Sequence, residues 1–233
     1  MDMTIGAILF DAYGTLLDVL SVSAMSEQFA LGHGVALSTL WRDKQLQYTW
    51  LRTLSNNYVD FWQVTAEALD YSAAALGISL SPEQRGLLLT QYERLTAFPD
   101  AAPALDALWQ NSVPLAVLSN GAPGMLEAAF VNVGLRNRFT GLLSVDTVRQ
   151  FKPAPAAYQI AVDHFGVPRS DLLLVSSNGW DVAGAASFGM RTYWINRRGA
   201  PLEQLGVNPT GIGRSLTDLA PWLATEAIPP HSG

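Results

Sequence analysis

The chain has 233 residues, of which 49% are hydrophobic, so it can bury a sizeable core as one large domain or as a core domain with a smaller insertion. Its formal net charge of −6 argues against nucleic acid or an anionic membrane as the main partner. It contains no cysteine, which excludes disulfides, thiolate metal ligands and a thiol nucleophile. The N-terminus lacks the basic segment of a signal peptide, and no apolar run is long enough to span a bilayer. We therefore expect a soluble, cytoplasmic protein with no membrane partner.

Four short apolar runs, each followed by polar residues, have the pattern of buried strands. They cover residues 5–10, 115–118, 172–175 and 192–195. Helical segments are expected between the later runs. Residues 123–133 begin with a proline and precede Gly134, and residues 155–165 begin with a proline and precede Gly166, as helix ends often do. Strands that alternate with helices predict an α/β fold with a Rossmann-like parallel-sheet core.

The long segment between the first and second expected strands has a different pattern. Residues 40–54 contain no glycine or proline, residues 61–76 end at Gly77, and Ser81 begins a capping box with proline at the first helical position. These features predict helices. We therefore expect a helical cap domain at residues 18–98, inserted into a core domain formed by residues 1–17 and 99–224. Residues 225–233 hold two prolines and little apolar content, so a flexible tail is expected there.

Polar side chains follow the apolar runs, at the edge of a parallel sheet where ligands bind. They are Asp11, Ser119, Asn120, Ser176, Asn178 and Asp181, and Lys152 lies between the second and third runs. None of the three histidines follows a run and no G-x-S-x-G segment occurs, which argues against a Ser-His-Asp triad. The expected nucleophile is therefore a carboxylate.

Four segments together resemble the motifs of the haloacid dehalogenase superfamily. They are Phe10-Asp11-Ala12-Tyr13-Gly14-Thr15-Leu16, Ser119-Asn120-Gly121, Lys152-Pro153 and Ser177-Asn178-Gly179-Trp180-Asp181. Each motif alone is weak, but the order and spacing agree across nearly the whole chain. The resemblance implies a Rossmann-like core with an inserted helical cap, and it implies that Asp11 is a covalent nucleophile.

Two departures distinguish this chain from the phosphatases of that superfamily. Tyr13 stands where they have a general-acid Asp, and Ser177 stands where they have a metal-binding Asp. Because a hard cation prefers carboxylate ligands, we expect no bound metal and no other cofactor. The same changes are the pattern of the L-2-haloacid dehalogenases. That subfamily also has a Trp-Arg pair and a Phe-Trp pair in the cap, found here as Trp41-Arg42 and Phe61-Trp62.

The resemblance implies hydrolytic conversion of short-chain (S)-2-haloacids to (R)-2-hydroxyacids with inversion, through an ester on Asp11. Asp11 would meet the substrate carboxylate, a repulsion of about 4 kcal/mol at ~4 Å and a protein-like dielectric, which Lys152 would offset. The implied catalytic residues are Asp11, Thr15, Arg42, Ser119, Lys152, Tyr158, Ser176, Asn178 and Asp181. The implied substrate contacts are Ala12, Tyr13, Arg42, Leu46, Phe61, Ser119, Asn120 and Trp180.

Within this scheme some residues have narrower expected roles. Arg42, Asn120 and the ring edge of Phe61 would cradle the leaving halide. Asp181 and Asn178 would orient the water that hydrolyses the ester.

Three further features complete these expectations. Tyr158 is expected to hydrogen-bond Ser176, although a buried tyrosine satisfied elsewhere is equally compatible. Asp43, beside Arg42, would repel an anionic substrate at the mouth of the site. The aromatic segment at residues 48–62 predicts a homodimer surface.

Other functions remain open at this point. One is a metal-dependent phosphatase of the same superfamily, against which Tyr13 and Ser177 argue. Another is displacement at C2 of a different small carboxylate, either defluorination or the opening of a cyclic imino acid, for which the same residues would serve. A catalytically silent binding module is disfavoured because Asp11, Lys152 and Asp181 are all present.

Overall fold

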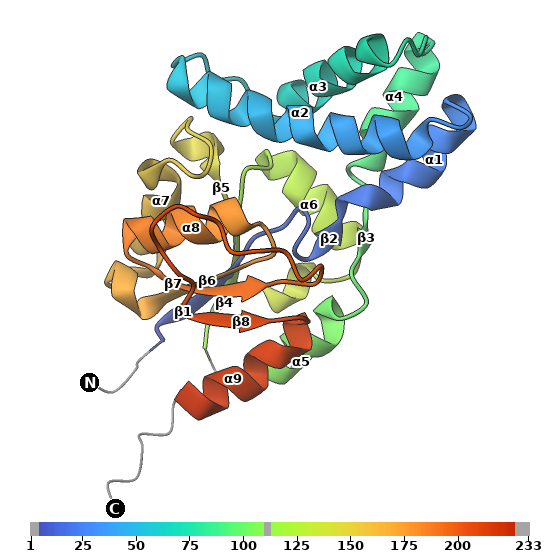
Figure 1. Cartoon of the computed structure of the whole chain (residues 1–233). Coiled ribbons are helices and arrows are strands. Elements are labelled where there is room, and N and C mark those ends of the chain that lie inside the picture. Colours follow the sequence, from blue (N-terminus) through green and yellow to red (C-terminus); the bar gives the residue numbers. More distant parts are fainter. Residues whose placement is uncertain (1–4, 110–112, 227–233) are drawn as a thin grey trace, which may run out of the picture.

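The computed structural model describes residues 5–109 and 113–226 (Figure 1). Its main element is a six-stranded sheet in the order β5-β4-β1-β6-β7-β8, in which every neighbouring pair is parallel. The strands are β1 (Ala7–Phe10), β4 (Leu115–Ser119), β5 (Gly141–Ser144), β6 (Leu172–Ser176), β7 (Arg191–Ile195) and β8 (Gly211–Gly213). All four strands expected from the apolar runs are present.

Strands β1, β4 and β6 are apolar except for the serines that end β4 and β6, because both faces of the sheet are covered. Every residue of β1, β4 and β6 is buried. Alternate residues point to opposite faces. Leu9 and Leu174 point to one face of the sheet, where they pack with Tyr158 and Ala185, whereas Phe10 points to the other face. The first face is covered by α7 (Pro155–Phe165) and α8 (Gly179–Phe188), and the second by α5 (Ala101–Trp109), α6 (Pro123–Asn132) and α9 (Leu219–Glu226).

The register brings the ends of the central strands level with one another. Phe10 of β1 pairs with Val117 of β4 on one side and with Val175 of β6 on the other. The residues that follow these strands therefore meet at one edge of the sheet. Short 3-10 helices link several elements: η1 (Val19–Val22), η2 (Arg136–Arg138), η3 (Val145–Thr147), η4 (Arg169–Asp171) and η5 (Leu216–Asp218).

Four helices lie together at one end of the molecule, beyond the sheet (Figure 1). They are α1 (Ser23–Phe29), α2 (Gly34–Leu54), α3 (Phe61–Ala75) and α4 (Pro82–Gln91). Ser81 caps α4 through the expected capping box. The chain enters and leaves this helical layer through β2 (Leu17–Asp18) and β3 (Thr96–Ala97), which pair antiparallel. The predicted fold class, a parallel-sheet core with an inserted helical cap, is confirmed.

The sequence patterns missed some elements and misplaced others. Helix α2 begins at Gly34, before the expected start, and α1, β5 and β8 were not predicted. Thr225 and Glu226, the first residues of the expected tail, end helix α9, and residues 227–233 lie outside the described part of the chain. Among residues 5–109 and 113–226, no helix has the length and apolarity needed to cross a membrane.

Candidate active site

Asp11 lies directly beyond strand β1, and the residue is only 5% exposed. Its Oδ2 accepts hydrogen bonds from the Thr15 hydroxyl at 2.9 Å and from the Asn178 amide at 2.7 Å. Its Oδ1 has one longer contact, with the Lys152 ammonium at 3.4 Å. The two oxygens are therefore unequal: Oδ2 is held by two donors, and Oδ1 retains free lone pairs.

Lys152 joins Asp11 to a second carboxylate. Its side chain is fully buried, and Nζ also lies 2.9 Å from Oδ2 of Asp181. The Lys152 backbone N–H donates to the side-chain oxygen of Asn120 at 2.9 Å, which fixes this loop against the end of β4. Burial alone lowers the pKa of Lys152, but Asp181 and Asp11 raise it more, so the net pKa lies above its ordinary value. The site therefore holds a permanent ammonium between two carboxylates.

Asp181 is fully buried at the start of α8. Its Oδ1 accepts from the Tyr158 hydroxyl at 2.9 Å, and Oδ2 accepts from Lys152. Burial raises the pKa of Asp181, and the Lys152 ammonium opposes that rise. The expected Tyr158–Ser176 bond is wrong, because the phenol bonds Asp181 and the Ser176 hydroxyl accepts locally from the Asn178 N–H at 3.1 Å.

Arg42 brings the cap to this site. From helix α2, its Nη2 donates to the Tyr13 carbonyl at 3.1 Å, and its Nη1 donates to Oε1 of Gln45 at 2.7 Å. The same Tyr13 carbonyl accepts from the Asn178 amide at 3.2 Å. Burial lowers the pKa of Arg42, with Tyr92 and Asp11 among the groups that oppose this. A guanidinium remains charged at physiological pH, so a cation of the cap contacts the loop that follows Asp11.

Apolar and aromatic side chains enclose the polar groups. The ring centroids of Tyr13 and Phe61 are 5.3 Å apart, and Phe61 is only 1% exposed. The ring centroids of Trp180 of α8 and Trp50 of the cap helix α2 are 5.6 Å apart. Ala12 is buried, and its carbonyl accepts the N–H groups of residues 15, 16 and 17, which forms the tight turn after the nucleophile.

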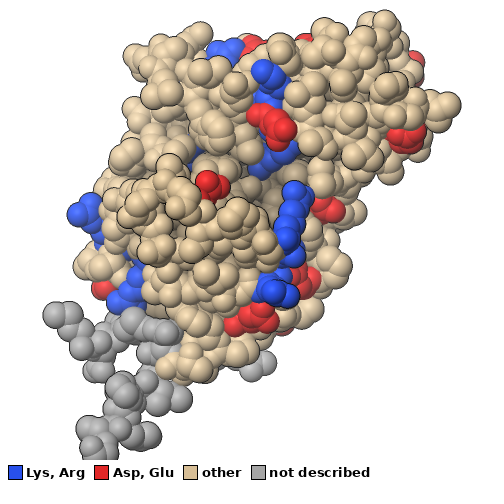
Figure 2. Space-filling view, viewed as in Figure 1, with Lys and Arg blue, Asp and Glu red and all other residues tan. Residues whose placement is uncertain are grey.

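An open cavity of about 600 Å³ lies between the cap and the core. Its charged lining residues are Asp18, Arg42, Asp43, Arg197, Arg198 and Glu203, and Leu46, Asn178 and Trp180 also line it. Basic and acidic side chains lie close together around the middle of the molecular face in Figure 2. Asp43 is exposed and lines this cavity. Asp11, Ser119, Asn120, Phe61 and Lys152 lie outside the cavity lining.

Ser119 and Asn120 lie beneath the cavity and do not form part of its wall. Ser119 is fully buried, and its hydroxyl accepts from the Gly121 N–H at 3.1 Å. Asn120 is 7% exposed and bonds Lys152. Both residues therefore shape the loop after β4.

Arg197 was missed in the sequence analysis, although it follows the fourth apolar run as closely as the residues that were identified. Its Nη1 donates to the Ser177 hydroxyl at 2.7 Å, and its Nη2 donates to the Thr15 carbonyl at 3.0 Å. It also pairs with Asp100 at 2.9 Å. A guanidinium therefore fixes the two loops that carry Thr15 and Asn178.

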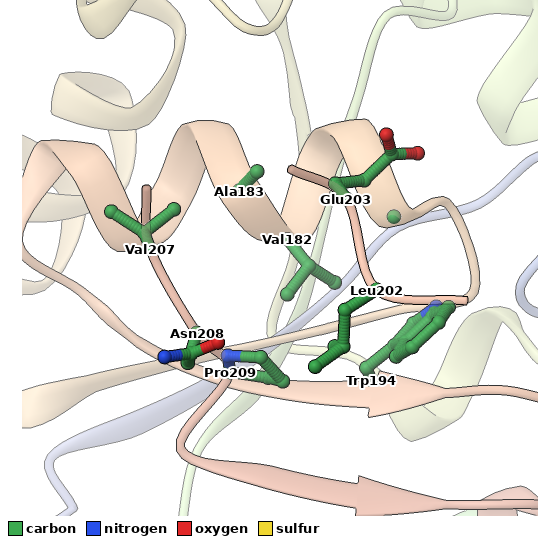
Figure 3. Close-up of a pocket in the computed structure, with 9 residues that line it drawn as sticks. Val182, Ala183, Trp194, Leu202, Glu203, Val207, Asn208 and Pro209 are labelled. Atoms are coloured by element: carbon green, nitrogen blue, oxygen red, sulfur yellow. The ribbon is translucent and has the colours of Figure 1, made fainter. Parts of the chain in front are cut away.

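A second cavity lies between α8, strand β7 and the loop that joins β7 to β8 (Figure 3). It is lined largely by apolar side chains that include Val182, Trp194 and Leu202, and its volume of about 10 Å³ holds at most one water molecule. It is too small for an organic acid. In the part of the chain that the structure describes, no three His, Cys, Asp or Glu side chains group as metal ligands would.

The fold and the site define a Rossmann-like α/β protein with a buried aspartate at the end of the first strand, beneath a helical cap. Residues 5–189 match the model of the haloacid dehalogenase-like hydrolases, and the chain belongs to this family. It is 40% identical over 218 residues to an (S)-2-haloacid dehalogenase of Pseudomonas fluorescens, covering 94% of this chain and 96% of that protein.

Solved structures agree. The crystal structure of an L-2-haloacid dehalogenase shares 47% identity with a TM-score of 0.93, covering 95% of this chain and 99% of the other. An L-2-haloacid dehalogenase from Xanthobacter autotrophicus, solved with chloropropionic acid covalently bound, shares 38% identity with a TM-score of 0.89 at the same coverage. The expected family is confirmed.

Proposed function

We propose that this enzyme hydrolyses short-chain (S)-2-haloacids to (R)-2-hydroxyacids and halide, with inversion at C2. The observation that carries the proposal is the unequal carboxylate of Asp11, whose Oδ1 is free to attack while Lys152 lies 3.4 Å away. The named activity of the relatives favours this reaction over phosphate ester hydrolysis. Tyr13 and Ser177 also favour it, because they replace carboxylates that a metal-dependent phosphatase would need.

In the first step, Oδ1 of Asp11 attacks C2 from the side opposite the halogen. The carbon–halogen bond breaks, and the halide leaves with the bonding electrons. Lys152 offsets the repulsion between Asp11 and the substrate carboxylate. Arg42, with the Asn120 amide and the ring edge of Phe61, stabilises the charge that develops on the halide.

After the first step, Oδ2 is the carbonyl oxygen of the ester, which water hydrolyses in the second step. Thr15 and Asn178 already donate to it at 2.9 Å and 2.7 Å, so they stabilise the negative charge on Oδ2 when water attacks the carbonyl carbon. Asp181 accepts the proton of that water, since burial makes it a stronger base than an exposed aspartate. The bond between the carbonyl carbon and Oδ1 breaks, and Oδ1 takes the proton held by Asp181 and leaves as the product hydroxyl. The second proton of the water is lost from the re-formed carboxyl group of Asp11 to solvent, which restores the carboxylate.

The other site residues support these steps. Tyr158 holds Asp181, and Ser119 and Ser176 hold the loops after β4 and β6. Ala12 and Tyr13 provide the backbone turn beside the substrate. Leu46 and Trp180 form the apolar part of the cavity wall.

Halide release from the separate enantiomers of 2-chloropropanoate and 2-bromopropanoate tests this function. We expect release from the (S) acids and retention of the (R) acids, with chiral chromatography showing the (R)-hydroxyacid as product. Hydrolysis of phosphate esters without halide release would contradict the proposal.

Chelation is expected to leave the reaction unchanged. Tyr13 and Ser177 occupy positions where a hard cation would need carboxylates, and the Ser177 hydroxyl already accepts from the Arg197 cation. The measurement is kcat before and after dialysis against EDTA. Loss of activity that returns with Mg²⁺ would favour the phosphatase alternative.

We also propose that the protein is a cytoplasmic homodimer. Each chain would consist of a cap domain at residues 18–98 and a core domain formed by residues 1–17 and 99–224. The paired strands β2 and β3 support these domain boundaries.

The homodimer surface is proposed to lie on the cap. Within the aromatic segment 48–62, Phe61 is buried and Trp50 packs on Trp180. Apolar side chains exposed on the cap helices and their connections, two of them within this segment, offer a surface for a second copy: Leu31, Val35, Leu51, Leu54, Tyr71 and Leu87.

A further inference from the structure

A chain of hydrogen bonds runs through the buried interface of the cap helices α2 and α3 and ends on Arg42. Arg42 Nη1 donates to Oε1 of Gln45 at 2.7 Å. Gln45 Nε2 donates to the Thr65 hydroxyl at 2.7 Å, and that hydroxyl donates to the Phe61 carbonyl at 2.6 Å. The side chains of Gln45 and Thr65 are fully buried. A polar chain of this kind is costly to bury unless every member is satisfied, as it is here.

The chain can run in only one direction. The Phe61 carbonyl only accepts, so the single hydroxyl proton of Thr65 is committed to it. The Thr65 oxygen must then accept from Gln45, which places the NH₂ group of Gln45 toward Thr65. The amide oxygen of Gln45 therefore faces Arg42, and Arg42 can only donate. A backbone carbonyl of α3 thus dictates which way the Gln45 amide points.

The other end of Arg42 meets the site. Its Nη2 donates to the Tyr13 carbonyl at 3.1 Å, so the guanidinium is held between Gln45 of the cap and the loop that follows Asp11. Trp41 adds a second hydrogen bond between α2 and α3 near Thr65, since its indole N–H donates to the Thr65 carbonyl at 2.8 Å. An arginine side chain has many rotamers in solution, and its ordering before the substrate arrives removes part of that entropic cost from the reaction.

We propose that Gln45 and Thr65 are positioning residues for Arg42, and that the hydroxyl of Thr65 sets the orientation of the Gln45 amide that holds the guanidinium against the Tyr13 carbonyl. The catalytic consequence rests on the proposed role of Arg42 at the leaving halide. Neither Gln45 nor Thr65 needs to touch the substrate. Without the hydroxyl, the Gln45 NH₂ group loses its acceptor on Thr65, and the amide is held on that side by its hydrogen bond with Tyr92 alone. The amide can then turn its NH₂ group toward Arg42, so that two donors face each other.

The test is Thr65→Val, which keeps the shape of the side chain and removes the hydroxyl. We expect kcat for (S)-2-chloropropanoate to fall about tenfold, which corresponds to about 1.4 kcal/mol, with KM changed less than about twofold. Thr65→Ser keeps the hydroxyl and should restore kcat. The matched control is Ser72→Ala, because Ser72 is also buried on α3 and donates to the carbonyl four residues earlier at 2.7 Å, but it does not contact Gln45.

Gln45→Met is a second variant in case Thr65→Val folds poorly, and it should show the same loss of kcat. A crystal structure of either variant tests the positioning of Arg42 independently of activity, since the contact between Arg42 Nη2 and the Tyr13 carbonyl oxygen should be lost. Retention of that contact in both variants, with kcat equal to that of Ser72→Ala, would overturn the proposal.

Arg42→Lys separates this proposal from the proposed function. If Arg42→Lys loses activity while Thr65→Val behaves as Ser72→Ala does, the positioning role of Gln45 and Thr65 is wrong and the role of Arg42 at the halide stands. If Arg42→Lys retains full kcat, the role of Arg42 at the halide is wrong. The crystal structure of Thr65→Val alone then decides whether Gln45 and Thr65 position Arg42.

Discussion

Lys152→Met is expected to lower kcat for halide release about a thousandfold or more, which corresponds to about 4 kcal/mol. The Lys152 ammonium is fully buried between Asp11 at 3.4 Å and Asp181 at 2.9 Å. Methionine fills a similar volume but leaves two buried carboxylates without a cation, and the removal of one partner from a buried ion pair commonly costs 3–5 kcal/mol. The substrate would then bring a third carboxylate into the site.

The control for this variant is Lys44→Met, which removes the only other lysine of the chain. Lys44 bonds Gln47 and lies over the Tyr71 ring on the cap, away from Asp11. Its kcat should stay within about twofold of the parent, because an exposed contact of this kind contributes little. Equal kcat values for the two lysine variants would place Lys152 outside the reaction.

Asp11→Asn is expected to abolish turnover, with kcat lowered about ten-thousandfold or more. An amide of the same shape is a poor nucleophile, although Thr15 and Asn178 can still donate to its oxygen. The fold should persist, since Lys152 keeps its pair with Asp181. The measurement is single-turnover halide release together with the thermal unfolding midpoint.

Asp163→Asn provides the matched control because it removes the same charge from an exposed aspartate that accepts only from Gln159. Its activity should equal that of the parent. If Asp11→Asn retained more than a few per cent of activity after deamidation was excluded by mass spectrometry, Asp11 would not be the nucleophile.

The central sheet and the polar groups at its edge could be predicted because burial on both faces leaves a plain signal in the sequence. Strands β1, β4 and β6 are continuous apolar runs, and their level register places Asp11, Ser119 and Asn178 at one edge. Strands β5 and β8 gave no such signal. β5 is only partly buried along most of its length, and β8 consists of three residues, two of them glycine.

The contacts that fix the site could not be predicted from spacing. Gln45 and Thr65 are twenty residues apart and resemble ordinary polar positions on two helices until α2 packs on α3. The predicted Tyr158–Ser176 bond failed for the same reason, since the reach of the phenol depends on how α7 packs against α8. Backbone groups that follow a strand satisfy nearby hydroxyls first, as the Asn178 N–H does for Ser176.

The most direct test of the covalent mechanism is a single turnover in H₂¹⁸O with enzyme in excess over an (S)-2-haloacid. Attack by Oδ1 of Asp11 followed by hydrolysis at the carbonyl carbon delivers an enzyme oxygen to the product. We therefore expect almost unlabelled hydroxyacid, while the peptide that contains Asp11 gains the mass of one ¹⁸O. A first-turnover product that carries ¹⁸O, with an unlabelled Asp11 peptide, would show that water attacks C2 directly and would contradict the aspartyl-ester mechanism.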